Sequence, residues 1–191
     1  MNILQGKKIT LIVTGSIAAY KAGELVRSLM RGGADVHVVM TESATHFITP
    51  LTMQTLSQNV VVTEMFNLVD EASIGHIKLA NDVDLIVVAP ATANIIAKAI
   101  NGIADDLASS ILLAASVPVV YAPAMNVHMW ENPVTQKNIR KLKSLGASFV
   151  EPEEGHLACG IEAKGRLAEI PRIVESVEVA LGGGDLKDLH F

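Results

Sequence analysis

Short runs of apolar residues alternate along the chain with amphipathic segments, and this alternation predicts the secondary structure. Runs with the length and composition of buried strands lie at 8–14, 35–41, 84–90, 117–124 and 147–152. Segments with helical spacing of apolar positions lie at 15–33, 43–58, 92–116, 133–145 and 169–181. Because strands and helices alternate at intervals that suit right-handed crossovers, we predict an α/β fold with a doubly wound parallel sheet.

A glycine and a proline refine two of these predictions. Gly102 divides 92–116 into two helices, because glycine commonly ends a helix. Pro50 suits the first turn of the helix predicted over 43–58. The stretch 156–165 shows neither the helical nor the strand period, so no element is predicted there.

The composition indicates one globular domain. The chain has 191 residues, half of them hydrophobic, which suffices for a single domain with a sizeable core over 1–181. The segment 182–191 opens with three glycines and is expected to be a frayed tail or a linker to a further domain. The net charge of −5 and the scattered 15 Lys and Arg residues argue against a nucleic-acid-binding protein.

Other classes of protein are also disfavoured. Residues 107–130 contain no Asp, Glu, Lys or Arg, but Pro118 and Pro123 interrupt them, so we predict a buried helix and strand and no membrane segment. A single cysteine excludes an internal disulfide and a multi-cysteine zinc site, and it fits a reducing, cytoplasmic location. The six histidines lack the spacing of a zinc-binding helix, so no metal is expected.

Candidate binding residues follow the predicted strands, and ligands of open α/β sheets bind beyond the carboxyl ends of strands. Gly15 and Ser16 follow the first strand, where a glycine lets the backbone approach a phosphate at a helix N-terminus. An ordinary tight turn would explain them equally well. Thr41 and Ser43 follow the second strand, where helix capping is the commoner role of a hydroxyl.

Further candidate site residues lie after two other predicted strands and at two isolated positions. APATAN at 89–94 combines small residues with Thr and Asn, which leaves room for a flat ring with polar edges. Asn126 lies in PAMNVHMW and has no evident core role, although the segment also fits a helix start. His76 is a candidate general base, whereas most lone histidines are surface or core groups. The single Cys159 is either a small buried apolar residue or a reactive group.

Five motifs that span nearly the whole chain resemble, in the same order, those of the flavin-dependent cysteine decarboxylases. The motifs are GSIAAYK at 15–21, GHI at 75–77, APATAN at 89–94, PAMNVHMW at 123–130 and LACG…KGRLAE at 157–169. The resemblance implies a Rossmann-like flavoprotein fold and flavin mononucleotide (FMN) as the cofactor. It also implies a carboxy-lyase of coenzyme A biosynthesis, which converts 4′-phosphopantothenoylcysteine to 4′-phosphopantetheine through thioaldehyde and enethiol intermediates.

The family pattern assigns roles to individual positions of this chain. It implies that the FMN phosphate lies near Gly15, Ser16, Ile17, Thr41 and Ser43, and that the flavin contacts Thr92, Ala93, Asn94 and Ala124. The catalytic residues that it implies are His76, Asn126 and Cys159. Asn126 would hold the substrate carboxylate, and Cys159 would donate a proton late in the reaction from a mobile loop.

Departures from the family pattern concern the substrate and the cysteine loop. Relatives often carry a basic residue at the position of Asn81, so Lys78 is the candidate that replaces it, and Met129 is a further substrate contact. Ala163 stands where a glycine is common, which predicts a stiffer hinge. The alternatives are a decarboxylase of C-terminal cysteine peptides, a flavin prenyltransferase and a regulatory binding subunit. The family pattern further implies a homotrimer or a dodecamer, and in some relatives fusion to a synthetase domain.

Overall fold

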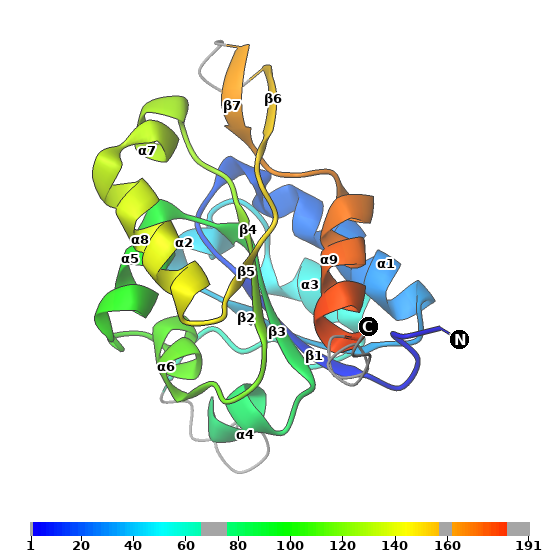
Figure 1. Ribbon diagram of the computed structural model, residues 1–191. Helices are drawn as coiled ribbons and strands as arrows, with labels where there is room; N and C mark the ends of the chain where they lie inside the picture. Colours follow the sequence, from blue (N-terminus) through cyan, green and yellow to red (C-terminus); the bar gives the residue numbers. More distant parts are fainter. Residues whose placement is uncertain (1, 66–75, 157–161, 183–191) are drawn as a thin grey trace, which may run out of the picture.

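The structure is a computed structural model that describes residues 2–65, 76–156 and 162–182, and a parallel five-stranded sheet forms its centre (Figure 1). The strand order is β2-β1-β3-β4-β5, and every neighbouring pair is parallel. The strands are β1 (Lys8–Val13), β2 (Asp35–Met40), β3 (Leu85–Ala91), β4 (Val119–Pro123) and β5 (Ser148–Phe149). The predicted doubly wound α/β class is therefore confirmed.

Helices cover both faces of the sheet. The helical segments are η1 (Ile17–Lys21), α1 (Ala22–Arg31), α2 (Glu42–Thr45), α3 (Pro50–Ser57), α4 (His76–Asn81), α5 (Ala93–Asn101), α6 (Leu107–Ala114), α7 (Val127–Glu131), α8 (Pro133–Ser144) and α9 (Ile170–Gly182). Helices α1, α3 and α9 bury apolar side chains against one face, and α4, α5, α6 and α8 bury theirs against the other. Because both faces are buried, β3 is apolar along its whole length.

Two boundaries differ from the sequence prediction. The segment 43–58 forms two helices, α2 and α3, with a break between them. The cause is Thr49, because a residue before proline is driven to extended backbone, and Thr49 has φ −80° and ψ 146°. Pro50 begins α3, as predicted. The strand expected over 147–152 is reduced to the two residues of β5, which form the edge of the sheet beyond β4.

An antiparallel hairpin and helix α4 are elements that the sequence did not predict. Strands β6 (Glu153–His156) and β7 (Glu162–Arg166) pair across the stretch 156–165, where no period was found. In Figure 1 the hairpin projects from the body of the molecule. A projecting hairpin has no buried face, so its strands lack the apolar alternation that identifies buried ones. Ala163, where the sequence predicts a stiffer hinge, lies inside β7, and Cys159 lies outside the described residues.

Helix α4 lies at the amino end of the sheet. The Oδ1 atom of Asn81 accepts hydrogen bonds from the backbone N and Oγ of Ser116, at 3.1 and 2.6 Å, and Ser116 precedes β4. In Figure 1, α4 is at the bottom of the molecule, whereas α7 and the hairpin are at the top. Within the described ranges, no helix is both long and apolar enough to cross a membrane.

Candidate functional site at the carboxyl edge of the sheet

The turns that follow four neighbouring strands meet at one edge of the sheet. The strand order β2-β1-β3-β4 puts these turns side by side, because the carboxyl ends of parallel strands share an edge. Each turn contributes one polar residue that caps the next helix through its side chain, and these residues are Ser16, Thr41, Thr92 and Asn126. The four turns that the sequence singled out therefore lie along one edge of the sheet.

Capping and ligand binding are compatible roles for the hydroxyls. The Oγ of Ser16 accepts from the backbone N of Ala18 at 3.3 Å, and the Oγ1 of Thr41 accepts from the backbone N of Ala44 at 3.3 Å. A hydroxyl has one proton to donate in addition to its acceptor sites. A side chain that caps a helix by accepting can therefore still donate to a phosphate oxygen, so the two interpretations of these residues do not exclude each other.

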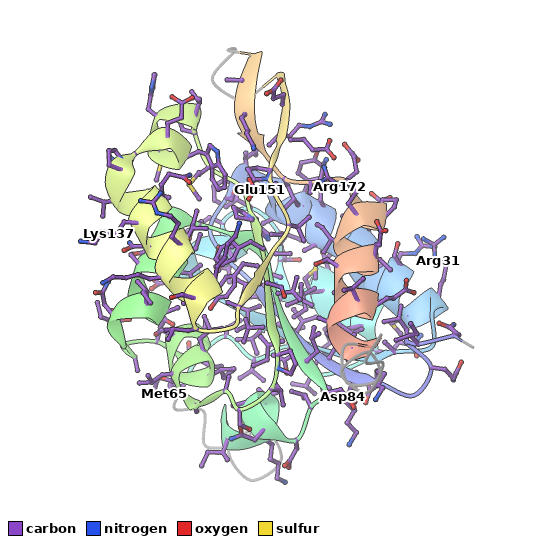
Figure 2. All side chains as sticks on the ribbon, viewed as in Figure 1. Arg31, Met65, Asp84, Lys137, Glu151 and Arg172 are labelled. Carbon is purple, nitrogen blue, oxygen red and sulfur yellow. The ribbon has the colours of Figure 1, made fainter. Side chains whose placement is uncertain are left out.

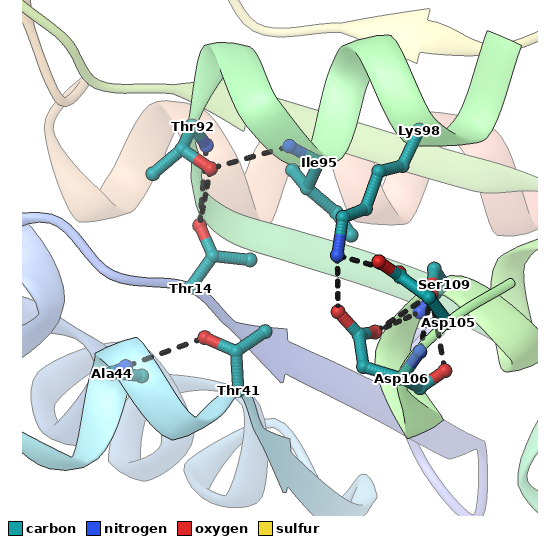
Figure 3. Close-up of polar contacts among 9 residues, drawn as sticks. All are labelled: Thr14, Thr41, Ala44, Thr92, Ile95, Lys98, Asp105, Asp106 and Ser109. Carbon is teal, nitrogen blue, oxygen red and sulfur yellow. Dashed lines mark hydrogen bonds and ion pairs between the residues drawn. The ribbon is translucent and has the colours of Figure 1, made fainter. Parts of the chain in front are cut away.

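Thr14 joins the turns after β1 and β3. Its side chain is 2% exposed. Its Oγ1 donates to the carbonyl O of Pro90 at 2.6 Å and accepts from the backbone N of Thr92 at 3.1 Å. Figure 3 shows the side chains of Thr14 and Thr92 pointing toward each other. The strand order reverses between β1 and β3, which is where doubly wound proteins bind nucleotides. Thr14 was not predicted as a site residue, and it fixes the geometry of this switch point.

Gly15 packs directly against Ser43. A Cβ added at Gly15 would lie well inside van der Waals contact of the Ser43 Cβ. Two hydrogen bonds restrain the turn at Gly15, so it cannot easily move away from Ser43. The backbone N of Ser16 donates to the O of Thr14 at 2.9 Å, and the Oγ1 of Thr14 donates to the O of Pro90. The predicted phosphate residues Gly15, Ser16 and Ser43 are thus in one compact cluster. Their hydroxyls and backbone fit the donor set that a phosphate group needs.

Replacing Gly15 with alanine should weaken flavin binding by about tenfold or more, because the new Cβ would displace Ser43 from the predicted phosphate cluster. Titration of the apoprotein with FMN, followed by flavin fluorescence, measures the effect. Gly182→Ala is the matched control, since its added Cβ would come no closer than 3.8 Å to the nearest atom, a side-chain carbon of Ile3. Equal FMN affinity of Gly15→Ala and the parent protein would contradict a phosphate site here.

Small residues form the part of the edge predicted to face the flavin ring. The backbone N of Ala124 donates to the O of Ala91 at 3.1 Å, which extends the pairing of β3 and β4 to the edge. Both alanines are buried, and Ala93 and the exposed Asn94 follow in the first turn of α5. Without larger side chains at these strand ends, a flat ring can approach the backbone.

The hairpin docks on the turn that carries Asn126. The backbone N of Met125 donates to the O of Gly165 at 3.0 Å. A Cβ at Gly165, whose φ is +150°, would collide with the backbone O of Met125, so glycine is required for this approach. The Oδ1 of Asn126 accepts from the backbone N of His128 at 2.8 Å. The structure therefore joins the two C-terminal motifs, PAMNVHMW and KGRLAE.

Charged side chains hold the hairpin stem on both sides. Lys164 Nζ lies 3.2 Å from Glu151 Oε2 and 5.7 Å from the centre of the Trp130 ring. Burial opposes the charged form of Glu151, but its two lysine partners outweigh burial and lower the pKa of its carboxyl. On the other side, Arg166 and Arg172 both pair with Glu153, at 3.1 and 3.4 Å. Glu151 and Arg172 are visible below the hairpin in Figure 2.

One chain does not bring all the predicted residues together. Lys78 lies on α4, and His76 is the first residue of that helix, at the opposite end of the molecule from α7 (Figure 1). Met129 lies on α7 and is 48% exposed. Cys159 lies outside the described residues, between the two strands of the docked hairpin. Among the residues that the structure describes, no three His, Cys, Asp or Glu side chains form a metal-binding group.

The fold and the edge define the class of protein. A parallel sheet of order 2-1-3-4-5, with a switch point between β1 and β3, is the arrangement of flavodoxin-like nucleotide-binding proteins. The sequence profile of the family described as Flavoprotein matches residues 2–182, so the chain belongs to the flavoprotein family and its cofactor is a flavin.

Two curated relatives illustrate the similarity of this chain to known proteins. The chain is 45% identical over 177 residues to a probable phosphopantothenoylcysteine decarboxylase of Streptococcus mutans, covering 92% of this chain and 99% of that protein. It is 50% identical over 176 residues to the coenzyme A biosynthesis bifunctional protein CoaBC of Bacillus subtilis. That match covers 92% of this chain and 43% of the relative, so the chain spans less than half the length of the bifunctional protein.

A solved structure supports the same relationship. A cysteine-to-serine mutant of PPC decarboxylase, complexed with pantothenoylaminoethenethiol, superimposes with a TM-score of 0.79 at 32% sequence identity. The superposition covers 92% of this chain and 98% of that chain. The central sheet, the helices on both faces and the site edge thus belong to a fold that is shared along the whole domain.

Proposed function

We propose that this chain is an FMN-dependent carboxy-lyase that converts 4′-phosphopantothenoylcysteine to 4′-phosphopantetheine in coenzyme A biosynthesis. The observation that carries the proposal is the 45% identity that extends over 99% of a probable phosphopantothenoylcysteine decarboxylase. The arrangement of the carboxyl edge supports it, because Ser16, Thr41 and Ser43 offer hydroxyls for a flavin phosphate. Thr92 and Ala124 would line the ring of the same cofactor.

The net reaction breaks the bond between Cα and the carboxylate of the cysteine, releases CO₂ and takes up one proton at the former Cα. A bound flavin would accept two electrons from the substrate, which makes loss of this carboxylate possible, and would return them to the decarboxylated compound afterwards. The residues of the chain have to hold the substrate carboxylate with an uncharged side chain and transfer protons to and from the substrate. Asn126, His76 and Cys159 are the residues assigned to these tasks.

Asn126 suits the carboxylate because an amide can donate a hydrogen bond without bearing charge. A lysine or arginine there would stabilise the ground-state anion and oppose departure of CO₂. Asn126 is also the N-cap of α7, where its Oδ1 accepts from the backbone N of His128. The docked stem of the hairpin contacts the backbone of Met125 next to it, which limits movement of the turn.

His76 and Cys159 are assigned to proton transfer. An imidazole can accept and release a proton near neutral pH, which suits removal of a proton from the substrate in the oxidising stage. A thiol has an unperturbed pKa of about 8.5, which allows Cys159 to donate a proton to the product in the reducing stage. In the sequence Cys159 lies between β6 and β7, and β7 is attached to the turn that carries Asn126 through the hydrogen bond from Met125 N to Gly165 O.

A direct assay tests the proposal. Purified protein should be yellow, retain FMN after gel filtration and release CO₂ from 4′-phosphopantothenoylcysteine. Peptides with a C-terminal cysteine, assayed side by side, test the alternative substrate, and a prenyl donor with reduced flavin tests the prenyltransferase alternative. A protein that takes up no FMN, or that prefers either alternative substrate, would overturn the proposal.

We also propose that the working form is a homo-oligomer. His76 and Asn126 lie at opposite ends of one chain, so a complete set of catalytic residues requires a second copy. Large apolar side chains are exposed beside the phosphate-binding turn, including Ile17 at 57% and Tyr20 at 62%. Burial of such side chains against another subunit would be favourable.

Mixing of two inactive variants tests the shared site. His76→Ala and Asn126→Asp should each be inactive alone, whereas refolding the two together should restore CO₂ release, because some sites then combine an intact histidine with an intact asparagine. Light scattering reports the size of each assembly. A monomeric parent, or mixtures that stay inactive although they form mixed oligomers, would show that both residues act within one chain.

A further inference from the structure

Helix α7 carries Asn126 at its N-cap but is short, since it spans only Val127–Glu131. A helix of this length gains little from its own hydrogen bonds, so tertiary contacts have to fix its position. Two of its side chains are buried in the body of the protein, because Val127 is 8% exposed and Trp130 is 7% exposed. The position of Asn126 therefore depends on what packs against the two ends of α7.

Strand β7 contacts α7 at both ends. At the N-terminal end, the backbone N of Met125 donates to the O of Gly165, as described above. At the C-terminal end, the Nζ of Lys164 lies over the ring of Trp130, 5.7 Å from the ring centroid. A lysine ammonium at this distance is attracted to the face of an indole ring. Two neighbouring residues of β7 thus contact the two ends of one helix.

Glu151 holds the ammonium group of Lys164 in place. Its Oε2 lies 3.2 Å from Lys164 Nζ, and its Oε1 lies 3.0 Å from Lys143 Nζ. The carboxylate thus bridges two lysines, and loss of either lysine leaves it with the other as a partner. The side chains of Lys164 and Glu151 are 39% and 44% exposed, so water screens the pair. We therefore expect the pair to direct Lys164 toward Trp130 rather than to determine whether the chain folds.

We propose that Lys164 is a positioning residue, which fixes α7 against β7 so that the amide of Asn126 meets the substrate carboxylate in the orientation that binding needs. This inference rests on the role of Asn126 in the function proposed above. Lys164 acts through Trp130, whose backbone N donates to the O of Asn126 at 2.9 Å. A displacement of Trp130 would reach Asn126 through this hydrogen bond.

Lys143 provides a matched control. Like Lys164, it pairs with Glu151, and its Nζ lies 5.7 Å from the centroid of an aromatic ring. That ring belongs to Phe149 in β5 and not to a residue of α7. Replacing either lysine with alanine therefore removes one ion pair and one ring contact, but only Lys164→Ala releases α7.

Steady-state kinetics with 4′-phosphopantothenoylcysteine tests the inference. Lys164→Ala should raise KM by about fivefold or more and change kcat by less than about twofold, because a displaced amide binds the carboxylate less well. Partial unfolding would instead lower kcat at an unchanged KM, because fewer molecules would be active. Lys164→Arg should restore the parent KM, since a guanidinium keeps the charge and stacks on aromatic rings. Lys143→Ala should leave KM unchanged.

The fluorescence of Trp130 gives a readout that does not depend on activity, because this residue is the only tryptophan of the chain. Quenching by acrylamide should be about twofold or more stronger in Lys164→Ala than in the parent protein, because release of α7 exposes the indole ring. Lys143→Ala should be quenched as the parent protein is.

A second variant covers the case in which Lys164→Ala does not fold. Lys164→Gln keeps most of the length of the side chain while removing its charge, and it should show the same changes. Unchanged KM in the folded variants, equal effects of Lys143→Ala, or a lower kcat at unchanged KM would overturn the inference. If the parent protein releases no CO₂, the proposed function fails, and the quenching comparison then decides whether Lys164 holds α7 in place.

Discussion

Replacing Asn126 with aspartate is expected to lower kcat/KM for CO₂ release by about 100-fold or more while the protein stays folded. The new carboxylate would face the carboxylate of the substrate. Two like charges about 4 Å apart repel by about 4 kcal/mol at an effective dielectric constant of about 20. The fold should persist because aspartate is as good a helix N-cap as asparagine, and Oδ1 of Asn126 performs that role for α7. Steady-state kinetics and a thermal melt measure both effects.

The chain offers a matched control for this substitution. Asn132 caps α8 in the same way, and its Oδ1 accepts from the backbone N of Val134 at 2.9 Å. Asn132→Asp adds the same charge at a helix N-terminus away from the predicted substrate, so it should change neither kinetics nor melting temperature appreciably. Comparable losses of activity in both variants would mean that Asn126 acts only as a cap.

Replacing Cys159 with serine is expected to stop formation of 4′-phosphopantetheine while the carboxylate is still lost. A serine hydroxyl is a far weaker acid than a thiol, so the proton needed in the reducing stage is not delivered. Product formation should fall by about 100-fold or more, as expected for loss of a general acid. A decarboxylated compound with two hydrogen atoms fewer than the product should accumulate, and mass spectrometry would identify it.

A solved structure and a second variant bear on this prediction. The structural neighbour that carries a cysteine-to-serine substitution is complexed with pantothenoylaminoethenethiol, an oxidised and decarboxylated compound of this kind. Cys159→Ala should behave as Cys159→Ser does, because both lack the thiol. Formation of complete product at the parent rate by either variant would remove Cys159 from the mechanism, whereas loss of CO₂ release as well would assign it to the first stage.

Comparison of particular elements shows which features could be predicted from the amino-acid sequence. The apolar runs identified β1 to β4 because these strands are buried on both faces, and burial leaves a local signal. Polar residues directly after those runs identified the four site turns, since the carboxyl ends of parallel strands share an edge. The hairpin β6–β7 gave no such signal, because its strands do not bury an apolar face in the core.

Contacts between distant segments required the tertiary structure. The Thr14 bonds to Pro90 and Thr92, and the docking of Gly165 on Met125, join residues far apart in the chain, and they depend on the strand order. A local pattern of residues does not encode which turns become neighbours. The ion pairs of Lys98 with Asp105 and Asp106 likewise depend on how the chain turns between α5 and α6.

The sequence by itself therefore determined the alternation of strands and helices, the edge on which the site lies and the types of residue available there. Burial and local turn chemistry produce those features, and both act over a few neighbouring residues. The tertiary structure alone decided that Thr14 fixes the switch point and that the hairpin is attached to the Asn126 turn. It alone also placed α4 at the opposite end from Asn126, because each crossover connection sets where distant segments meet in space.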